Sequence, residues 1–502
     1  MTDLGPFPSR ELGVLLHPSS LPGCDRIGTL GADAHDFVAW LATTGAAIWQ
    51  ILPLSINGKD DSPYFSSSAF AGNPWLVDLD DLVRHGLLDE TGLPDHVSHG
   101  PIDFDRMRHS KQPFLLAAAD RFLDTPDHAW RPGFDAFARD SDWLTPTCHF
   151  LALKDLHGDI PWWDWPESIR RCESEAVEQS RRSLDEAIVR WSAMLYFFEV
   201  QWSAVRADAA ERGIRILGDI PIYVAPDSAD VWLDQEQFQL DQAGGLIFQS
   251  GVPPDYFSEN GQLWGNPLYR WDIMQADGYS WWLSRLRRCL EMSDIVRIDH
   301  FRALSAYWEV PGDAKTAIGG RWVEGPGQSF LDAIKQAFPD MPFVAEDLGD
   351  LDEPVYELRD ANDLPGMRVL QFGFNGDPGN PHCPEAIVEA CVAYTGTHDN
   401  NTTAGWWNEL DADTRAIVVE ELDIGDETDV ESVVWKLIET AIGSKAVAAV
   451  IPVQDLLVLD RHSRMNVPST TTGNWSWRMP QGVLDPELAA SIRQLAERHG
   501  RS

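Results

Sequence analysis

The sequence predicts an α/β protein built on a (β/α)8 TIM barrel, with large subdomains inserted over the carboxyl ends of its strands. Short apolar, β-branched runs that end in polar residues recur eight times along the 502 residues, and segments with helical periodicity separate most of them. This alternation is typical of a parallel β/α fold, and eight strands are the number that closes a barrel.

The predicted strands are spread along the whole chain. They are GVLLH from Gly13, AIWQILPL from Ala47, IRILGDIPIYV from Ile214, DIVRIDHF from Asp294, PFVAEDLG from Pro342, GMRVLQFGF from Gly366, VAYTGTHD from Val392 and AVAAVIPVQDLLVL from Ala446. Amphipathic stretches that begin at Asp33, Ser280 and Gln328 carry apolar residues three and four apart, which predicts helices on the outside of the barrel.

Two connections between these strands are too long for simple crossovers. We expect inserted subdomains at about 55–213, between the second and third strands, and at about 225–293, between the third and fourth. Both should rise over the carboxyl ends of the strands, where barrel active sites lie. The whole chain, 1–502, should form one catalytic domain without a β-sandwich after the last strand.

The charge composition limits the classes of molecule that the protein is expected to bind. With 39 basic and 79 acidic residues, the formal net charge is -40. Such a surface repels phosphate backbones and anionic lipid headgroups, so we expect no nucleic acid and no membrane partner, whereas a neutral sugar is compatible with it. The amino-terminal residues lack the basic start and apolar run of a secretory signal, and a cytoplasmic location is therefore expected.

Carboxylates stand near the ends of four predicted strands, and they are the main functional clue. They are Asp219, Asp299, Glu346 and Asp399. Because strand ends converge on one face of a barrel, residues far apart in the sequence can meet there. A single Asp after a strand is usually a turn or a helix cap, but several together favour a shared site.

Paired carboxylates suit the cleavage of glycosidic bonds, in which one attacks or steadies the anomeric carbon and the other protonates the leaving oxygen. No GxSxG, phosphate-binding loop or HExxH motif is evident, which argues against serine hydrolysis, nucleotide chemistry and zinc proteolysis. His300 and His398 flank two of the carboxylates without the spacing of a metal site. We therefore predict no metal and no cofactor.

Tryptophan is abundant, with 22 residues, and several lie beside Asn, Gly and Asp, where an indole face could stack on sugar rings. The candidates are Trp162, Trp163, Trp264, Trp406, Trp407 and the block NWSWR from Asn474. Most tryptophans fill protein cores, so we expect a minority of them to contact a glucan.

Ordered blocks along nearly the whole chain carry a family resemblance. They are GVLLHPSSLPG, WQILPL, SPYFSSSAFAGNPWLVDL, GDIPIYVAPDSADVW, GVPPDYFSENGQLWGNPLY, VRIDHFRAL, VAEDLG, TGTHDNNTTAGWW and RMNVPSTTTGNWSWR. In these blocks the chain resembles the 4-α-glucanotransferases of the amylomaltase (disproportionating enzyme) family, glycoside hydrolase family 77, within the α-amylase clan.

The resemblance implies a role for each matching residue. Asp299 would be the nucleophile, Glu346 the acid/base and Asp399 a third carboxylate that holds sugar hydroxyls and steadies the transition state. The implied substrate-binding residues are Tyr64, Asp219, Trp264, Arg297, His398 and Asn466. Arg297 lies two residues before Asp299, on the same strand face, and would keep it ionised. Trp264 and the loop from Gly251 would fold over the bound chain.

The implied activity is transfer of a 1,4-α-glucan (maltodextrin) segment to a glucose or maltodextrin acceptor. It would proceed by a retaining double displacement through a covalent glycosyl-enzyme. The alternative is an α-glucan hydrolase of the same clan, with water as acceptor. A catalytically silent glucan-binding protein is a third possibility that the three carboxylates disfavour.

Overall fold

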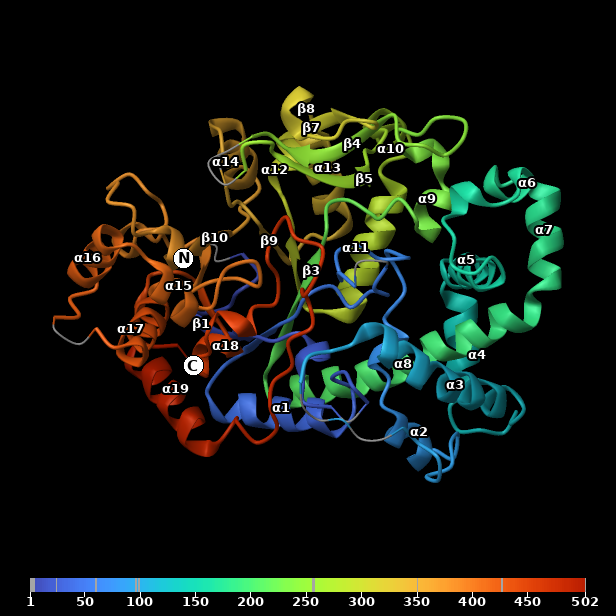
Figure 1. Cartoon of the computed structure of the whole chain (residues 1–502), viewed down its shortest axis with the longest axis horizontal. Helices are drawn as coiled ribbons and strands as arrows, with labels where there is room; N and C mark the ends of the chain where they lie inside the picture. The colour runs from blue at the N-terminus through green and yellow to red at the C-terminus, as the bar shows by residue number, and fades with distance from the viewer. Residues whose placement is uncertain are drawn as a thin grey trace.

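A parallel sheet of eight strands forms the centre of the computed structural model, in the order β10-β11-β12-β1-β2-β3-β6-β9 (Figure 1). Its strands are β1 (Glu11–Leu15), β2 (Ile48–Gln50), β3 (Arg215–Ile220), β6 (Ile295–Ile298), β9 (Phe343–Ala345), β10 (Gly366–Val369), β11 (Cys391–Tyr394) and β12 (Ala448–Pro452). The structure describes residues 5–23, 25–58, 61–94, 97, 100–254, 258–349, 351–425 and 428–501.

The sheet is nearly closed into a barrel, and each strand overlaps one of the eight predicted runs. Neighbouring strands pair in parallel from β10 round to β9. At the remaining gap, the N–H of Ala345 donates to the carbonyl of Pro365 at 2.9 Å. The predicted (β/α)8 fold class is therefore confirmed.

The strands are buried on both faces, which explains their continuous apolar runs. Every residue of β1, β11 and β12 is buried. Inside the barrel, the Tyr394 hydroxyl donates to Gln50 Oε1 at 2.9 Å. The Trp49 indole, also fully buried, donates to the carbonyl of Leu16 at 2.7 Å. Both of these buried donors thus have a hydrogen-bond acceptor.

Helices cover the outside of the barrel: α1 (Ala32–Thr43), α8 (Asp185–Glu211), α11 (Ser280–Met292), α13 (Gly327–Ala337), α14 (Glu353–Asp360), α17 (Val430–Gly443) and α19 (Pro486–Arg498). The three predicted amphipathic helices correspond to α1, α11 and α13. Carboxylate caps fix two of the starts, because Asp429 accepts from Ser432 N and Asp485 accepts from Leu488 N.

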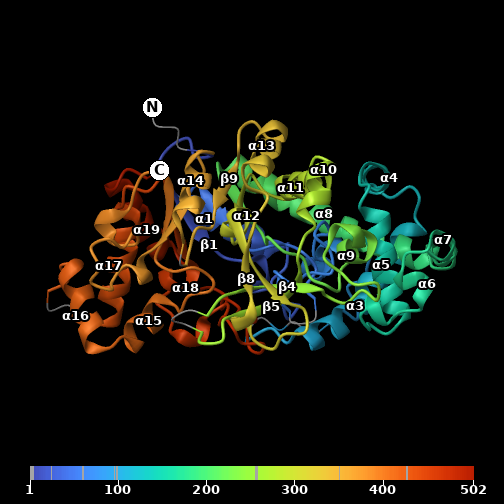
Figure 2. The same ribbon diagram turned by 90° about the horizontal axis from the view of Figure 1, so that it is seen from above.

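The connection between β2 and β3 is helical. It forms α2 (Leu79–Arg84), α3 (Phe104–Leu123), α4 (Arg131–Asp140), α5 (Leu144–Leu156), α6 (Glu167–Arg170) and α7 (Ser174–Ser183) before α8. Figures 1 and 2 both place α3–α7 at one end of the molecule. The opposite end holds α15 (Thr403–Glu409), α16 (Ala412–Glu421) and α17. The limits of the predicted insertions, about 55–213 and 225–293, stay predictions.

A second, antiparallel sheet of four strands has the order β5-β4-β7-β8. Its strands are β4 (Phe248–Val252), β5 (Gln262–Pro267), β7 (Ala306–Pro311) and β8 (Arg321–Glu324). Two connections build it, since β4 and β5 precede β6 whereas β7 and β8 follow it. The sequence analysis did not predict this sheet. The short helices α9 (Ala229–Leu233), α10 (Trp271–Ala276), α12 (Arg302–Ser305) and α18 (Val453–Leu456) complete the fold.

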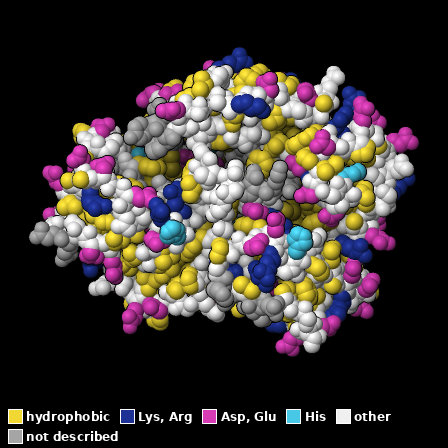
Figure 3. Space-filling model, in the orientation of Figure 1, with side chains coloured by type: hydrophobic (Ala, Val, Ile, Leu, Met, Phe, Trp, Pro, Cys, Tyr) yellow, Lys and Arg dark blue, Asp and Glu magenta, His cyan; other side chains and the backbone are white. Residues whose placement is uncertain are grey.

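Acidic side chains are scattered over the face shown in Figure 3, in keeping with the net charge of -40. Among the described helices, none combines the length and the apolar character needed to cross a lipid bilayer. After β12 the described residues form helices and loops without a further strand.

Arg501 is fully buried at the amino-terminal ends of β1 and β12. Its guanidinium donates to backbone carbonyls of β1, of α17 and of the residues between α17 and β12. The acceptors are Glu11, Ile442, Ser444, Ala446 and Val447. Since a buried acceptor without a donor is costly, this side chain should contribute much more to stability than a surface arginine.

We expect Arg501→Met to lower the free energy of unfolding by about 2–4 kcal/mol, because it removes the donors of several buried carbonyls. Urea unfolding followed by circular dichroism measures this. The matched control is Arg493→Met on the exposed face of α19, where the arginine pairs with Glu497 one turn away. Equal stability of the two variants would contradict the assignment.

Candidate active site

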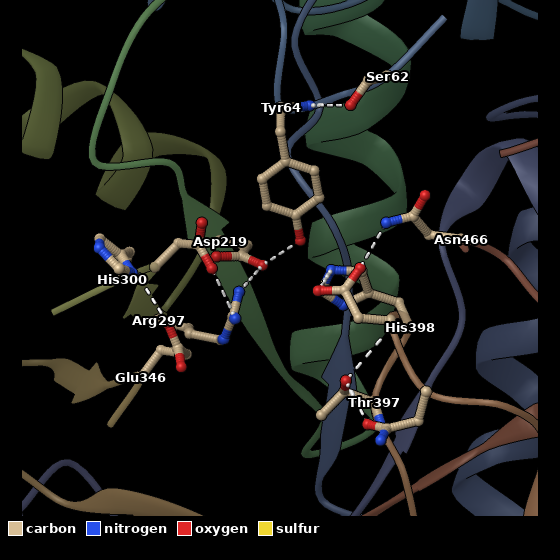
Figure 4. Close-up of polar contacts among 12 residues, drawn as sticks. Ser62, Tyr64, Asp219, Arg297, His300, Glu346, Thr397, His398 and Asn466 are labelled. Atoms are coloured by element: carbon tan, nitrogen blue, oxygen red, sulfur yellow. Dashed lines mark hydrogen bonds and ion pairs between the residues drawn. The ribbon is translucent and has the colours of Figure 1, made fainter. Parts of the chain in front are cut away.

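Four carboxylates that the sequence places at strand ends meet around the carboxyl end of the barrel. Asp219 lies in β3, Asp299 directly follows β6 and Glu346 directly follows β9. Asp399 lies five residues beyond β11. Figure 4 shows Asp219, Arg297, His300 and Glu346 on one side of the site, with Thr397, His398 and Asn466 on the other and the Tyr64 ring between them.

Arg297 joins two of these carboxylates. Its Nη1 donates to Asp219 Oδ2 at 2.5 Å and its Nη2 donates to Asp299 Oδ1 at 2.7 Å. The third donor, Nε, points to the Met367 sulfur at 3.3 Å. Because residues two apart on a strand point to the same face, β6 presents Arg297 and Asp299 to the site together.

Burial would by itself disfavour the charge of Arg297, yet the negative charges of Asp219 and Asp299 raise its pKa well above the usual range. The Tyr64 hydroxyl donates to Asp219 Oδ2 at 2.7 Å, on the same oxygen as Arg297. Burial, reinforced by the charge of Asp219, raises the pKa of Tyr64 well above its usual value. The cation and the phenol therefore keep their protons as donors to the carboxylates.

Glu346 has a different environment, since its carboxyl is held by backbone N–H groups. The N–H of His300 donates to Oε2 at 2.6 Å and the N–H of Leu348 donates to Oε1 at 2.9 Å. His300 has a φ of 50°, a left-handed conformation that is uncommon for a non-glycine residue and typical of functional sites. Burial, followed by the negative charge of Asp299, raises the pKa of Glu346 to about 8.

The environments of Glu346 and Asp299 therefore differ, because a guanidinium holds Asp299 whereas backbone N–H groups hold Glu346. Asp299 is ion-paired with Arg297 and its side chain is 27 % exposed, so its free oxygen is accessible to a substrate. Glu346 holds a proton up to about pH 8. Retaining cleavage of a glycosidic bond uses two carboxyl groups in different environments, one as nucleophile and one as proton donor.

Asp399 forms the other side of the site, and its side chain is 45 % exposed. Asn466 Nδ2 donates to Asp399 Oδ1 at 2.6 Å, and His398 Nε2 lies 3.3 Å from Oδ2. Arg464 Nη2 donates to the backbone carbonyl of Asp399 at 3.0 Å. These contacts fix the carboxylate while they leave part of it open to a ligand.

An aromatic stack lines the space between Asp219 and Asp399. The rings of Tyr64 and His398 are stacked, with centroids 5.2 Å apart and an angle of 14° between their planes. Trp475 packs against both, at 5.6 Å and 6.0 Å. Burial lowers the pKa of His398, so its imidazole stays neutral at neutral pH.

Trp264, on β5, brings the second sheet to the site. Its ring meets the His300 imidazole edge to face, with centroids 4.7 Å apart. The loop from Gly251 that leads to Trp264 was also predicted to cover a bound chain, but its residues 255–257 lie outside the described part of the structure.

The structure thus brings all nine predicted site residues into one region, and it adds partners that the sequence analysis did not single out. Arg464 is one of these, although it lies in the same block as Asn466, which could have indicated it. Of the tryptophan candidates, Trp162 and Trp407 are buried, whereas Trp163, Trp264 and Trp406 are partly exposed. In the described residues, no cluster of His, Cys, Asp and Glu has the make-up of a metal site.

A barrel with paired, differently tuned carboxylates at its carboxyl end defines the class of enzymes that cleave and form glycosidic bonds. A family model described as 4-alpha-glucanotransferase matches residues 16–484. The 4-alpha-glucanotransferase of Thermus thermophilus is 44% identical over 495 residues, which cover 97% of this chain and 98% of that protein. The chloroplastic/amyloplastic 4-alpha-glucanotransferase of Solanum tuberosum is 42% identical over 499 residues, 98% of this chain and 86% of that protein.

Among solved structures, the amylomaltase from Streptococcus agalactiae in complex with acarbose has a TM-score of 0.93 and 35% sequence identity. The match covers 98% of this chain and all of that one, 100%. The chain belongs to the 4-alpha-glucanotransferase family, glycoside hydrolase family 77. This membership supports the predicted transferase over the alternative α-glucan hydrolase.

The contacts of Glu346 predict how its proton affinity depends on Asp299. In the free protein the pKa of Glu346 should be about 8, and Asp299→Asn should lower it, because the substitution removes a neighbouring negative charge. Infrared spectroscopy of protein with isotope-labelled glutamate, with Glu346→Gln as the blank, measures both values. An unchanged or higher pKa in Asp299→Asn would contradict this electrostatic coupling.

Proposed function

We propose that the protein transfers 1,4-α-glucan segments from a maltodextrin donor to a glucose or maltodextrin acceptor, by a retaining double displacement. The observation that carries the proposal is the contrast between Asp299, which is ion-paired with Arg297, and Glu346, which is held by two backbone N–H groups and has its pKa raised to about 8. Family membership supports the choice of an α-glucan as substrate.

In the first step, an Asp299 carboxylate oxygen attacks the anomeric carbon while Glu346 gives its proton to the glycosidic oxygen. The bond between these two atoms breaks, and the donor chain beyond it leaves with a free hydroxyl. The product is a glycosyl ester on Asp299 with inverted configuration. Arg297 supports this step because it orients Asp299 and stabilises its negative charge before attack.

Formation of the ester also prepares Glu346 for the second step. The negative charge of Asp299 is one of the causes that raise the pKa of Glu346, and that charge disappears when the ester forms. The pKa of Glu346 then falls, so the group that has just lost a proton can act as a base. It accepts the proton of the acceptor hydroxyl as that oxygen attacks the anomeric carbon, and the α-linkage is restored.

The remaining polar groups would bind the sugar whose anomeric carbon reacts. Asp399 offers a carboxylate, fixed by Asn466 and His398, to a pair of sugar hydroxyls. Asp219, whose side chain has no exposed surface, would act on that sugar indirectly, through its hydrogen bonds with Tyr64 and Arg297. The Tyr64–His398 stack offers the apolar surface that a pyranose ring packs against.

The acceptor would bind on the side of Trp264 and His300, where an indole faces the turn that carries the acid/base. A stacked acceptor sugar would place its hydroxyl for attack and exclude water from the ester, and both effects favour transfer over hydrolysis. The reaction as written needs only the side chains of this chain and the two glucans. A metal or organic cofactor has no step to perform in it.

Incubation with maltotriose alone should produce glucose together with a ladder of longer maltodextrins, because each transfer conserves the number of glycosidic bonds. Chromatography of the products, with reducing ends assayed in parallel, measures this. A constant number of reducing ends identifies transfer, whereas a steady increase would show that water is the main acceptor and would refute the proposed transferase.

Asp299→Asn should lower turnover by at least about 10³-fold, because an amide neither attacks the anomeric carbon nor forms the ester. Binding of maltodextrins, measured by calorimetry, should be largely retained, and the thermal unfolding curve should show a folded protein. The matched control is Asp413→Asn, in the exposed first turn of α16, which should leave turnover unchanged. Substantial turnover in Asp299→Asn would refute its role as nucleophile.

A further inference from the structure

The barrel is least complete between β9 and β10, the two ends of the strand order. In the described part of the chain, a single backbone hydrogen bond crosses this gap, from Ala345 to Pro365. The neighbouring pair, β10 and β11, is in register over the whole length of both strands. We call the gap between β9 and β10 the seam, and it lies directly beside Glu346.

At the seam, side-chain hydrogen bonds replace the backbone hydrogen bonds that are missing between β9 and β10. Asp347 directly follows Glu346, and its side chain is fully buried. Its Oδ1 accepts the N–H of Met367 at 2.6 Å, while its Oδ2 accepts from Arg368 Nη1 at 3.1 Å. Arg368 Nη1 also donates to the Met367 carbonyl at 2.6 Å. The two side chains thus satisfy the backbone groups of Met367 that a paired strand would otherwise satisfy.

The Asp347 carboxylate has little freedom to move. Arg359, from α14, donates to the same oxygen as Arg368, so two cations hold it in place. Gly366 leaves the space that the carboxylate occupies, since a Cβ at that position would overlap both of its oxygens. Charge, hydrogen bonds and space therefore all define one position for Asp347.

The fixed carboxylate anchors the turn that carries Glu346. Glu346, Asp347 and Leu348 are consecutive, and the N–H of Leu348 is one of the two donors to the Glu346 carboxyl. Moving Asp347 would shift this donor relative to the carboxyl. A displacement of about 1 Å at a reacting group can cost on the order of 100-fold in rate.

We propose that Asp347 is a positioning residue for proton transfer, an inference that rests on the proposed role of Glu346 as acid/base. Asp347 connects the Glu346 turn to β10 across the seam and thereby orients the Glu346 carboxyl toward the glycosidic oxygen. A purely structural role would stabilise the fold and leave the proton donor unaffected. The two roles differ in how activity depends on the leaving group.

The test compares two donors in single-turnover reactions without added acceptor, so that only formation of the glycosyl ester, and not the later step in which Glu346 acts as base, is measured. Maltotriose needs a proton on its leaving oxygen, whereas α-maltotriosyl fluoride releases fluoride with much less help from an acid. In Asp347→Asn, we expect the single-turnover rate of maltotriose cleavage to fall by about 10- to 100-fold, with a much smaller loss in the single-turnover rate of fluoride release. Chromatography and a fluoride electrode measure the two rates.

Gly366→Ala tests the same contact without changing any charge. The added methyl group must displace the Asp347 carboxylate, so this variant should show the same selective loss on maltotriose, and it keeps the test decisive if Asp347→Asn does not fold. The matched control is Glu199→Gln, which breaks the buried ion pair of Glu199 with Arg288 away from the seam. It should lower the melting temperature without changing the ratio of the two rates.

Equal losses on both donors in Asp347→Asn and Gly366→Ala, or no loss in either variant, would overturn the positioning role. Failure of the proposed function is recognised separately with Glu346→Gln. If that variant lost both rates equally, Glu346 would not be the proton donor, whatever Asp347 does. A selective loss in Glu346→Gln together with an equal loss in the Asp347 and Gly366 variants would refute only the inference about Asp347.

Discussion

The Arg297 guanidinium is the group on which the rest of the site depends. It is a buried cation, and the cost of burying it is offset because it contacts two carboxylates at hydrogen-bond distance. Burial raises the pKa of Asp219 to about 7, and the positive charge of Arg297 opposes that rise. The bond from Nη2 also fixes the orientation of Asp299.

This single cation also explains why Glu346 differs from Asp299. Glu346 receives backbone N–H groups of His300 and Leu348, which hold the carboxyl without a full opposing charge. Burial and the anion on Asp299 are then left to raise its pKa. Two carboxyl groups of similar chemistry therefore have different partners, a guanidinium for Asp299 and backbone N–H groups for Glu346, and the partners follow from the strands that carry them.

The sequence predicts the barrel and the strand-end carboxylates well, because both depend on local patterns. β6 presents Arg297 and Asp299 through simple alternation, and Asp219 and Glu346 follow apolar runs. Tyr64 and Asn466 are different. They reach the site on long loops whose course depends on distant contacts, such as Tyr64 with Asp219, so only the family resemblance indicated them.

The four-stranded sheet was missed for a related reason. In β8, RWVE has no buried residue and thus carries no core pattern, and the partner of β7, β4, lies in a different connection of the barrel. The tryptophans also show that a local sequence pattern does not determine whether a side chain is buried. Trp162 stands next to Asp and Trp in a loop-like segment, yet its indole is fully buried and donates to the Pro226 carbonyl. Sequence shows the residue type, whereas burial is decided by segments far away along the chain.

The contacts at the seam suggest why an otherwise regular barrel would lack backbone pairing beside Glu346, the proposed acid/base. A complete ladder between β9 and β10 would fix the strands, but it would leave the turn after β9 to be held by its own loop. The Asp347 carboxylate instead bonds to β10 and to α14 at once, so it connects the turn with two elements in different layers. Neighbouring residues of an extended chain point to opposite sides. Glu346 can therefore face the site while Asp347 faces the seam, and the proposed proton donor would be positioned by a carboxylate on the opposite side of the chain.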